Sequence, residues 1–412
     1  MGLQPRRERM PLMVDFFSGL CKLLPTRREV SPLQAVQAST RSPRSATSSY
    51  IPGLDGIRAI AFLLVFWAHA LPAVSYYIPA TLGVTIFFFL SGYLITTLLR
   101  RELERTGTIS LRDFYIRRTL RIFAPLYVVF ALAAAFAHFI MHWPAGNRIG
   151  ILSLLFYFYN YAAALRWDAW LPLGMNVVWS LAVEEHFYLL FPLLYLAMVR
   201  RKLSRITQNR LLIGFCLAEL VWRFVLIAVL HNRTLWTYYA TDARLDSILW
   251  GCLLALAANP VFGDRPLLPK RRQFAGFAVA LLLLGASLVP RSILYKESLR
   301  YTVQALALYA IFTFVTANPK HWSVTWLEWT PLRYIGWTSY VLYLSHDFIL
   351  NVLTARIPGH QWLTGPLAFA IAVAFATAIR YTLELPLQRL RARFRTVPEA
   401  DFTPADGHGL VS

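Results

Sequence analysis

Charged residues and cysteines are both scarce in this chain. Only 15% of its 412 residues are charged and three are cysteine, whereas 57% are hydrophobic. Cys21, Cys216 and Cys252 lie far apart without CxxC or CxxH context, so the sequence indicates neither a disulfide scaffold nor a cysteine-based metal site. The apolar residues form stretches of roughly 18 to 25, the length that crosses a bilayer core, which excludes a water-soluble globule and a disordered chain.

Several catalytic signatures are also missing. The sequence has no glycine-rich phosphate loop of the GxxxxGK[ST] form, no GxSxG nucleophile elbow and no internal repeat. The sequence therefore lacks the motifs that usually indicate ATP-driven transport and serine hydrolysis. The histidines inside the apolar stretches come singly from different stretches, so we expect no metal ion.

Basic residues outnumber acidic ones. The 41 Lys and Arg against 21 Asp and Glu give a formal charge of +20, which in a soluble protein would suggest a nucleic-acid partner. Here the basic residues cluster in short loops between apolar stretches, as the positive-inside rule for membrane proteins expects. We therefore expect a lipid bilayer as the partner and no nucleic acid.

The apolar pattern predicts an all-α integral membrane protein with about ten transmembrane helices. Thirty Lys and Arg residues fall in alternate segments between these helices and seven in the others, which predicts that both the N- and C-termini are cytoplasmic. The expected spans are residues 55–75, 80–99, 122–142, 176–199, 211–230, 242–259, 273–290, 301–317, 333–356 and 363–386.

The predicted membrane domain covers residues 51–386 and makes the chain a multi-pass protein of the inner (plasma) membrane. Residues 1–50 form an Arg-, Ser- and Pro-rich cytoplasmic tail that we expect to be poorly ordered, and residues 387–412 form a cytoplasmic C-terminal tail. Residues 149–172 are aromatic and moderately apolar, but a full crossing there would invert every later loop against the charge count. We predict a re-entrant or interfacial segment instead.

Ionisable residues inside a span are costly and point to function. Arg58 and His69 lie eleven residues apart in the first span, almost three helical turns, so both side chains share one face. We expect Arg58 near the cytoplasmic edge and His69 well inside the membrane. The alternatives are a snorkelling anchor for Arg58 and an interhelical hydrogen bond for His69.

Three arginines, Arg117, Arg118 and Arg121, precede the third span. At the N-terminal end of a helix, their charge would add to that of unpaired backbone N–H groups, which predicts an anion-binding site. The alternative is anchoring to lipid headgroups, which alone would explain arginines in a cytoplasmic loop.

The fourth span carries Glu184, Glu185 and His186 a few turns from its outer end. Adjacent residues of a helix point about 100° apart, so at most one of the two glutamates faces the same spot as His69. We expect Glu184 and His69 to lie at similar depth, where a buried carboxyl group beside an imidazole forms an acid/base pair. The alternative is a structural salt bridge between helices.

Further polar residues near the outer ends of spans suggest a cavity open to the outside. In the ninth span His346 is followed by Asp347, and we expect His346 to join His69, Glu184 and Glu185 as a catalytic group. Two pairs at i, i+4 spacing, Glu219 with Arg223 and Arg380 with Glu384, we interpret as packing pairs. The expected acceptor cavity is lined by Trp179, Ser180, Arg244, Asp246 and Tyr343.

Taken together, these residues resemble the acyltransferase-3 family of integral-membrane O-acyltransferases. The resemblance covers about residues 51–386. It is carried by six motifs in the family's order and spacing: GLDGIRAIAFLLVFWAHA, FFFLSGYLI, RRTLRIFAPLY, WSLAVEEHFYLLFP, ARLDSILWG and SYVLYLSHDF. Any one of these motifs would be weak, but six in order are specific.

The resemblance implies that an acyl group, usually acetyl, passes from a cytoplasmic coenzyme A thioester to a hydroxyl of a carbohydrate or other acceptor. The family's functional Arg and His of the first span, its RxxR pair and its two glutamates fall on Arg58, His69, Arg118, Arg121, Glu184 and Glu185. His186 stands where the family often has Gln, and Ser345 where an aromatic residue commonly precedes the His. The sequence shows no appended esterase-like domain after residue 386, so we expect this domain to act alone or with a separate partner.

Acyl-coenzyme A, with acetyl as the expected acyl group, is therefore the expected co-substrate. Its phosphates would dock on Arg58, Arg117, Arg118 and Arg121, and its pantetheine arm would rise along the face that Arg58 shares with His69. His69 would act as a general base or carry the acyl group transiently, and the sequence does not separate these two routes. The alternative function is a transporter or flippase for lipid-linked sugars, although the repeat symmetry typical of transporters is missing.

Overall fold

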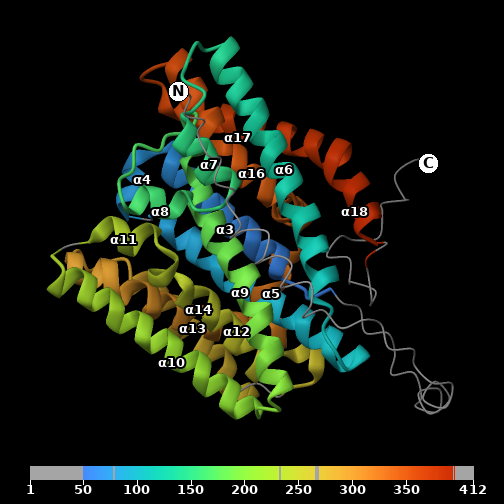
Figure 1. Ribbon diagram of the computed structural model, residues 1–412. Coiled ribbons are helices and arrows are strands. Elements are labelled where there is room, and N and C mark those ends of the chain that lie inside the picture. The colour runs from blue at the N-terminus through green and yellow to red at the C-terminus, as the bar shows by residue number, and fades with distance from the viewer. Residues whose placement is uncertain (1–49, 78, 232, 265–268, 393, 395–412) are drawn as a thin grey trace, which may run out of the picture. The chain divides into compact units, whose positions relative to one another are not determined.

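The computed structural model describes residues 50–77, 79–231, 233–264, 269–392 and 394. Within these residues the chain is helical and contains no β-strand, which confirms the predicted all-α class (Figure 1). The predicted N-terminal tail lies outside the described residues except for Tyr50. The predicted C-terminal tail is described only to residue 392 and at Phe394.

Each of the ten predicted spans corresponds to a helix. Seven helical segments of the described residues are long and apolar enough to cross a membrane. The shorter α3 and α13 and the more polar α16 are not among these seven, so the number ten and the sides of the termini stay predictions. The ten helices are α3 (Leu54–Ala70), α5 (Ala80–Thr106), α6 (Leu111–Phe139), α9 (Trp179–Arg200), α10 (Arg205–Phe224), α12 (Leu245–Ala257), α13 (Lys270–Ala286), α14 (Arg300–Ala317), α16 (Thr330–Arg356) and α17 (Gln361–Ile379).

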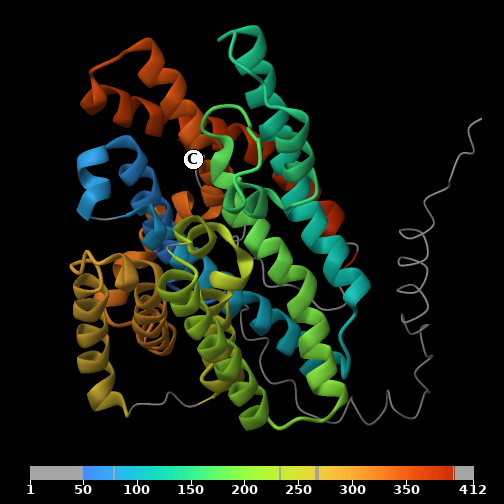
Figure 2. The same ribbon diagram turned by 60° about the vertical axis from the view of Figure 1, so that its left-hand side comes forward.

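Helices α3 and α5 lie inside the bundle. Helix α5 packs against both α3 and α12, and α16 packs against α3 and α17. In two views, α10, α13 and α14 lie on one side of α3 and α5, and α6 lies on the other (Figures 1 and 2). Helices α6, α9 and α16 enclose, together with α3 and α5, a space in which predicted site residues of four spans meet.

Two glycines allow α5 and α12 to cross at close range. A Cβ atom on Gly92 would lie 1.9 Å from the backbone oxygen of Ile248, and one on Gly251 would lie 2.0 Å from that of Phe89. No side chain fits at such distances, so the two backbones touch directly at this crossing. This close contact fixes how α5 lies on α12.

The segment predicted to be re-entrant forms two short helices, α7 (Arg148–Leu155) and α8 (Tyr159–Ala164). Neither is long enough to cross a bilayer by itself. Asn147 caps α7, because its side chain accepts a hydrogen bond from the Gly150 N–H and donates one to the Asp168 carbonyl. The segment thus folds back on itself.

The helix that follows α17 is irregular. Residues Arg380–Glu384 form a π-helical turn, and α18 (Leu385–Ala392) continues from it. The predicted tenth span, 363–386, therefore contains this turn near its end. Wider turns of this kind are frequent at functional sites, because they change the direction in which side chains point.

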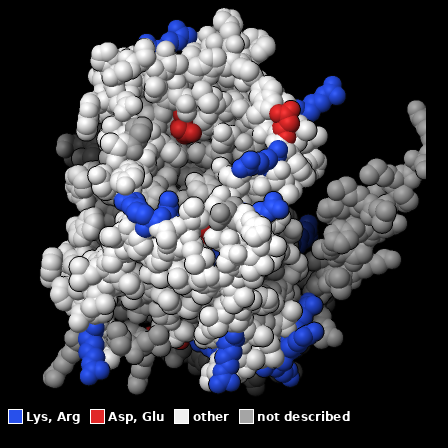
Figure 3. Space-filling model, turned by 90° about the vertical axis from the view of Figure 1, so that its left-hand side faces the viewer, with Lys and Arg blue, Asp and Glu red and all other residues white. Residues whose placement is uncertain are grey.

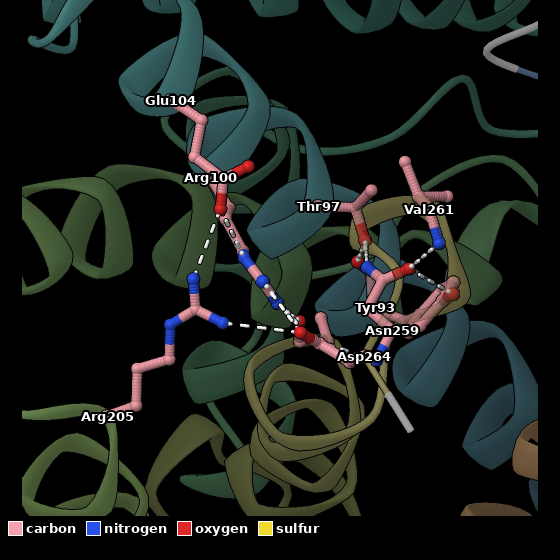
Figure 4. A network of polar contacts seen from close by, with 9 residues as sticks. Tyr93, Thr97, Arg100, Glu104, Arg205, Asn259, Val261 and Asp264 are labelled. Carbon is pink, nitrogen blue, oxygen red and sulfur yellow. Dashed lines mark hydrogen bonds and ion pairs between the residues drawn. The ribbon is translucent and has the colours of Figure 1, made fainter. Parts of the chain in front are cut away.

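A polar network joins the end of α5 to α10 and to the segment after α12 (Figure 4). Arg100 donates to both carboxylate oxygens of Asp264, at 2.6 and 3.1 Å, and Arg205 donates to Asp264 and to Glu104, at 3.4 and 3.2 Å. Burial alone would raise the pKa of Asp264, but the hydrogen bonds and charge of Arg100 lower it below its usual value. The charged Asp264 carboxylate therefore connects α5 and α10 to the segment after α12.

Candidate active site

A cavity of about 200 Å³ lies between α3, α5, α6, α9, α16 and the π-turn with α18. Its lining is charged at one end, where α3 begins, and is formed by aromatic and hydroxyl side chains toward the other. We call these the Arg58 end and the His69 end, because α3 begins near Arg58 and ends just after His69. The charged residues of the lining are Arg58, Arg118, Arg121, Glu184, Glu185, Arg380, Glu384 and Arg391.

Arg58 is held in place by an acidic partner on its own helix. Its guanidinium lies 3.2 Å from the Asp55 carboxylate, which also accepts a hydrogen bond of 2.8 Å from the Trp337 indole of α16. Asp55 is 1% exposed and Arg58 13%, so the pair is largely shielded from solvent. A neutralised but still reachable guanidinium can exchange part of its contact with Asp55 for an incoming anion.

The three arginines of α6 face different surroundings. Arg118 and Arg121 line the cavity, whereas Arg117 points to Glu102, at 3.2 Å, and to the Phe394 carbonyl, at 2.9 Å. The prediction that all three form one anion site is therefore wrong for Arg117. Helix α6 already begins at Leu111 with Ser110 as its N-cap, so the three arginines lie inside the helix. Their backbone N–H groups are therefore not the unpaired groups of a helix N-terminus that the sequence predicted.

Both glutamates of α9 line the cavity. Glu184 accepts a hydrogen bond of 2.6 Å from the Tyr188 hydroxyl, and the Tyr188 ring lies 5.3 Å from the guanidinium of Arg118. Glu185 is different, because its Oε1 atom is buried without a hydrogen-bond partner. A buried carboxyl oxygen without a donor is rare in folded proteins, and a contact with a ligand would account for it.

Neither glutamate contacts His69, which corrects the predicted acid/base pair of Glu184 and His69. The charge of Arg118 acts on the carboxyl groups of both Glu184 and Glu185 instead. Tyr157, which joins α7 to α8, lies close to Glu185. Burial raises the pKa of Tyr157 well above its usual range, and the negative charge of Glu185 raises it further. The α7–α8 segment therefore lies next to Glu185.

His69 lies in the last turn of α3 and is exposed. Its depth in the membrane stays a prediction, and α3 is 17 residues long and ends at Ala70. Its Nδ1 atom is 2.9 Å from Nε2 of His346, and the two rings stack nearly in parallel with centroids 5.1 Å apart. Asp347, the next residue of α16, lies close enough for its charge to act on His69.

The partner of His69 is completely buried. His346 is 0% exposed, and its Nδ1 atom is 2.8 Å from the Tyr343 carbonyl oxygen one turn earlier in α16. The Phe62 ring meets the His346 ring edge-on with centroids 5.8 Å apart, and the centroid of Phe66 lies 6.2 Å away. Since the Tyr343 side chain lines the cavity, the histidine pair lies just beyond its His69 end.

The predicted acceptor cavity is brought together only in part. Ser180 and Tyr343 line the cavity and their hydroxyls are 2.7 Å apart. Trp179, Arg244 and Asp246 do not line it. The Arg244 guanidinium packs 3.8 Å from the Tyr301 ring centroid, and Asp246 binds Arg223 at 2.7 Å, so both belong to the packing between helices.

The packing-pair interpretation is confirmed for Glu219 and Arg223, and the charge of Arg380 also acts on Glu384. Arg223 lies 3.3 Å from Glu219, as predicted. Arg380 and Glu384, in contrast, both line the cavity, and the Arg380 guanidinium lies over the Trp337 ring at 5.7 Å. The spacing of Arg380, Glu384 and Arg391, one and three turns apart, was a signal that these three side chains share a face.

The cavity lining also includes side chains that sequence reasoning missed. Trp337 and Tyr188 each bind a carboxylate of the charged end, and Ser91 accepts a hydrogen bond of 3.1 Å from Tyr188. All three lie inside motifs that carried the resemblance or next to one. Their aromatic or hydroxyl side chains are ordinary in a membrane helix, so their type gave no signal.

Comparisons with known proteins point to an acyltransferase. The family model of an acyltransferase domain, Acyl_transf_3, matches residues 51–383. The peptidoglycan O-acetyltransferase OatA of Listeria monocytogenes is 30% identical over 318 residues, 74% of this chain and 50% of its own length. The putative peptidoglycan O-acetyltransferase YrhL of Bacillus subtilis is 30% identical over 74% of this chain and 49% of its own, and a putative O-acetyltransferase of Staphylococcus aureus is 28% identical over 82% and 58%.

The chain spans about half the length of these curated relatives. No solved structure gives a significant match. The family model nevertheless covers most of the chain and includes every residue of the cavity described above up to Arg380. The chain therefore belongs to the acyltransferase-3 family and carries its acyltransferase domain.

Proposed function

We propose that this protein is a membrane O-acyltransferase that moves an acetyl group from acetyl-coenzyme A to a hydroxyl of a carbohydrate acceptor. The observation that carries the proposal is that the two ends of the cavity differ in their residues. Arginines gather at one end, and a hydrogen-bonded histidine pair with one exposed imidazole lies beyond the other. A donor bearing several phosphates and an acceptor hydroxyl would approach such a site from opposite ends.

The charged end suits the phosphates of coenzyme A. Arg58, Arg118 and Arg121 present guanidinium groups that bind phosphate through paired hydrogen bonds. Arg380 from the π-turn adds a fourth positive group. The unpaired Oε1 of Glu185 offers an acceptor for an N–H or O–H group of the arm that follows the phosphates. These residues would hold the donor, and the topology predicted from the loops places them on the cytoplasmic side of the inner (plasma) membrane.

The reaction itself needs one base. The acceptor hydroxyl oxygen forms a bond to the acyl carbon, the carbon–sulfur bond of the thioester breaks, and the hydroxyl proton ends on the thiol sulfur. His69 would take that proton from the hydroxyl and return it to the leaving sulfur. Its exposed position at the end of α3 makes it reachable for an acceptor outside the membrane.

The acceptor class follows from the relatives. OatA is named a peptidoglycan O-acetyltransferase and YrhL a putative one. We infer that the acceptor of this chain is likewise a sugar of an envelope polysaccharide. The hydroxyl pair of Ser180 and Tyr343 at the His69 end would bind acceptor hydroxyls.

The first experiment measures coenzyme A release by the purified chain in detergent. We expect acetyl-coenzyme A to be cleaved when a crude envelope glycan extract is present, and His69→Ala to lose at least 99% of this activity, since general base catalysis contributes roughly 10²–10⁴-fold. His138→Ala is the matched control, because His138 is an exposed histidine near the end of α6. Glycan-dependent release that survives in folded His69→Ala would remove His69 from the mechanism.

The same assay separates an enzyme from a transporter of lipid-linked sugars. A transporter would bind the glycan without cleaving the thioester. Absence of both coenzyme A binding and release, in a wild-type chain that elutes as one folded species, would contradict the proposed function.

A further inference from the structure

The hydrogen bonds of His346 determine where its proton lies. Its Nδ1 atom is 2.8 Å from the Tyr343 carbonyl oxygen, and a carbonyl only accepts hydrogen bonds. Nδ1 must therefore carry the proton. A neutral imidazole has a single N–H group, so Nε2 of His346 carries a lone pair and accepts.

The surroundings of His346 favour this neutral form. The ring is 0% exposed, and Phe62 and Phe66 cover it. A second proton would place a charge among aromatic rings, which costs desolvation free energy. It would also turn Nε2 into a donor, so that His69 would lose its hydrogen-bond acceptor. Asp347 is the acidic neighbour on the same helix, but its charge acts on the exposed His69.

The tautomer of His346 also determines which nitrogen of His69 carries a proton. Since Nε2 of His346 accepts, the Nδ1 atom of His69, 2.9 Å away, must donate. Nε2 of neutral His69 is then left with its lone pair. Among the described residues no hydrogen bond occupies this Nε2, and the His69 side chain is exposed.

We propose that His346 is a positioning residue that fixes His69 in the tautomer whose Nε2 accepts a proton. The inference rests on the proposed function, in which His69 is the base. The arrangement does the work that a carboxylate does for the histidine of a serine protease, where loss of the correct tautomer lowers kcat by about 10⁴. Here a neutral, buried imidazole orients His69, and the separate Asp347 carboxylate stabilises the charge that His69 acquires. The hydroxyl proton moves to Nε2 of His69, and His346 keeps its own proton throughout.

A spectroscopic experiment tests the tautomer directly. The chain is labelled with ¹⁵N-histidine, and the His69 signals are assigned from their loss in His69→Ala. We expect wild-type His69 at neutral pH to show a protonated Nδ1 and an unprotonated Nε2. In His346→Ala the preference should shift toward the protonated Nε2 that is usual for free histidine. A protonated Nε2 in the folded wild type would overturn the proposal, whether or not the chain is active.

Kinetics test the consequence for catalysis. His346→Ala should lower kcat at least tenfold and leave KM for acetyl-coenzyme A unchanged, because the arginine end of the cavity is untouched. His346→Gln, whose side-chain oxygen can accept from His69 Nδ1, should recover part of kcat. A purely structural role would instead lower the folded fraction of both variants and leave kcat per folded molecule unchanged, and that result would also overturn the proposal. Activity that persists in His69→Ala would remove His69 as the base of the proposed function, whereas the spectrum reports the tautomer independently.

Discussion

Arg117, Arg118 and Arg121 lie within two turns of α6, yet their contacts differ. Arg117 is occupied by Glu102 and by a backbone carbonyl, whereas Arg118 and Arg121 line the cavity. Arg118 and Arg121 therefore lie where the donor is proposed to bind, and Arg117 does not. This division provides a matched control for donor binding.

We predict that Arg118→Ala or Arg121→Ala weakens binding of acetyl-coenzyme A about 10- to 100-fold, because each removes a charge-assisted hydrogen bond of about 1.5–3 kcal/mol. Binding is measured by isothermal titration in detergent at low and high salt. The loss should shrink as salt rises. Arg117→Ala should bind as the wild type does. Equal affinities in all three variants would favour headgroup anchoring for the whole cluster.

A second prediction concerns the fully buried ion pair of Arg223 and Asp246. Arg223→Met should destabilise the protein by about 3–5 kcal/mol, because it leaves the Asp246 carboxylate buried without its partner. Thermal unfolding in detergent measures the effect. Adding Asp246→Asn should restore part of the lost stability. Arg210→Met, at an exposed position of the same helix, should change the unfolding free energy by less than about 0.5 kcal/mol.

The sequence predicted direct contacts only where they are local, although it did place His346 and His69 in one catalytic group. Arg58 with Asp55 and Arg223 with Glu219 follow from i, i+3 and i, i+4 spacing on one helix. The contact of His69 with His346 joins residues 277 positions apart. It depends on how α3 and α16 lie against each other, and hydropathy carries no information on that.

At the scale of elements, the contact of α5 with α12 shows how glycines replace side-chain packing. Inside a membrane, lipid tails are as apolar as leucine, so helices gain stability by close van der Waals contact. Gly92 and Gly251 each lie against the backbone of the opposite helix. Helix α5 also carries cavity residues on another face, so this contact positions the site.

We predict that Gly251→Ala destabilises the protein by about 1–3 kcal/mol, because the added methyl group forces the two backbones apart. The melting temperature in detergent should fall, and coenzyme A binding should weaken as α5 moves. Gly214→Ala is the matched control. A Cβ atom there meets nothing within 4 Å, so the substitution should leave the melting temperature unchanged or raise it. A normal melting temperature for Gly251→Ala would contradict the close crossing.

Helices were predictable as spans but not in their ends. A span predicted from hydropathy ends at the edge of the apolar stretch. The helices extend further, α5 to Thr106 and α6 back to Leu111, because the charged residues there also form helices well. This extension is why the arginines of α6 are not at a helix N-terminus. The π-turn at Arg380–Glu384 was likewise invisible, because a wider turn changes direction without changing composition.

For the whole molecule, the surface agrees with a membrane environment. On the face that Figure 3 shows, Lys and Arg side chains lie at the lower edge, in a band about halfway up and at the upper edge, with Asp and Glu side chains in the upper half, and most of the remaining surface is uncharged. Large apolar side chains such as Leu282 and Val279 of α13 are 74% and 62% exposed. In water such exposure would be costly, but toward lipid it is expected.

The last prediction tests the topology from which the direction of transfer follows. In a background where Cys21, Cys216 and Cys252 are replaced, we expect Ile149→Cys and Leu173→Cys to react with an impermeant thiol reagent from outside intact cells. Ile149 lies in the first turn of α7 and Leu173 follows α8, and both are exposed, at 43% and 51%. Thr108→Cys, in the exposed turn between α5 and α6, should react only after the membrane is permeabilised. The Arg58 end of the cavity would then face the cytoplasm, where coenzyme A thioesters are made, and His69 would face the acceptor outside. Labelling of Ile149→Cys and Leu173→Cys from opposite sides would show that the segment crosses, and it would reverse the side assigned to every later loop.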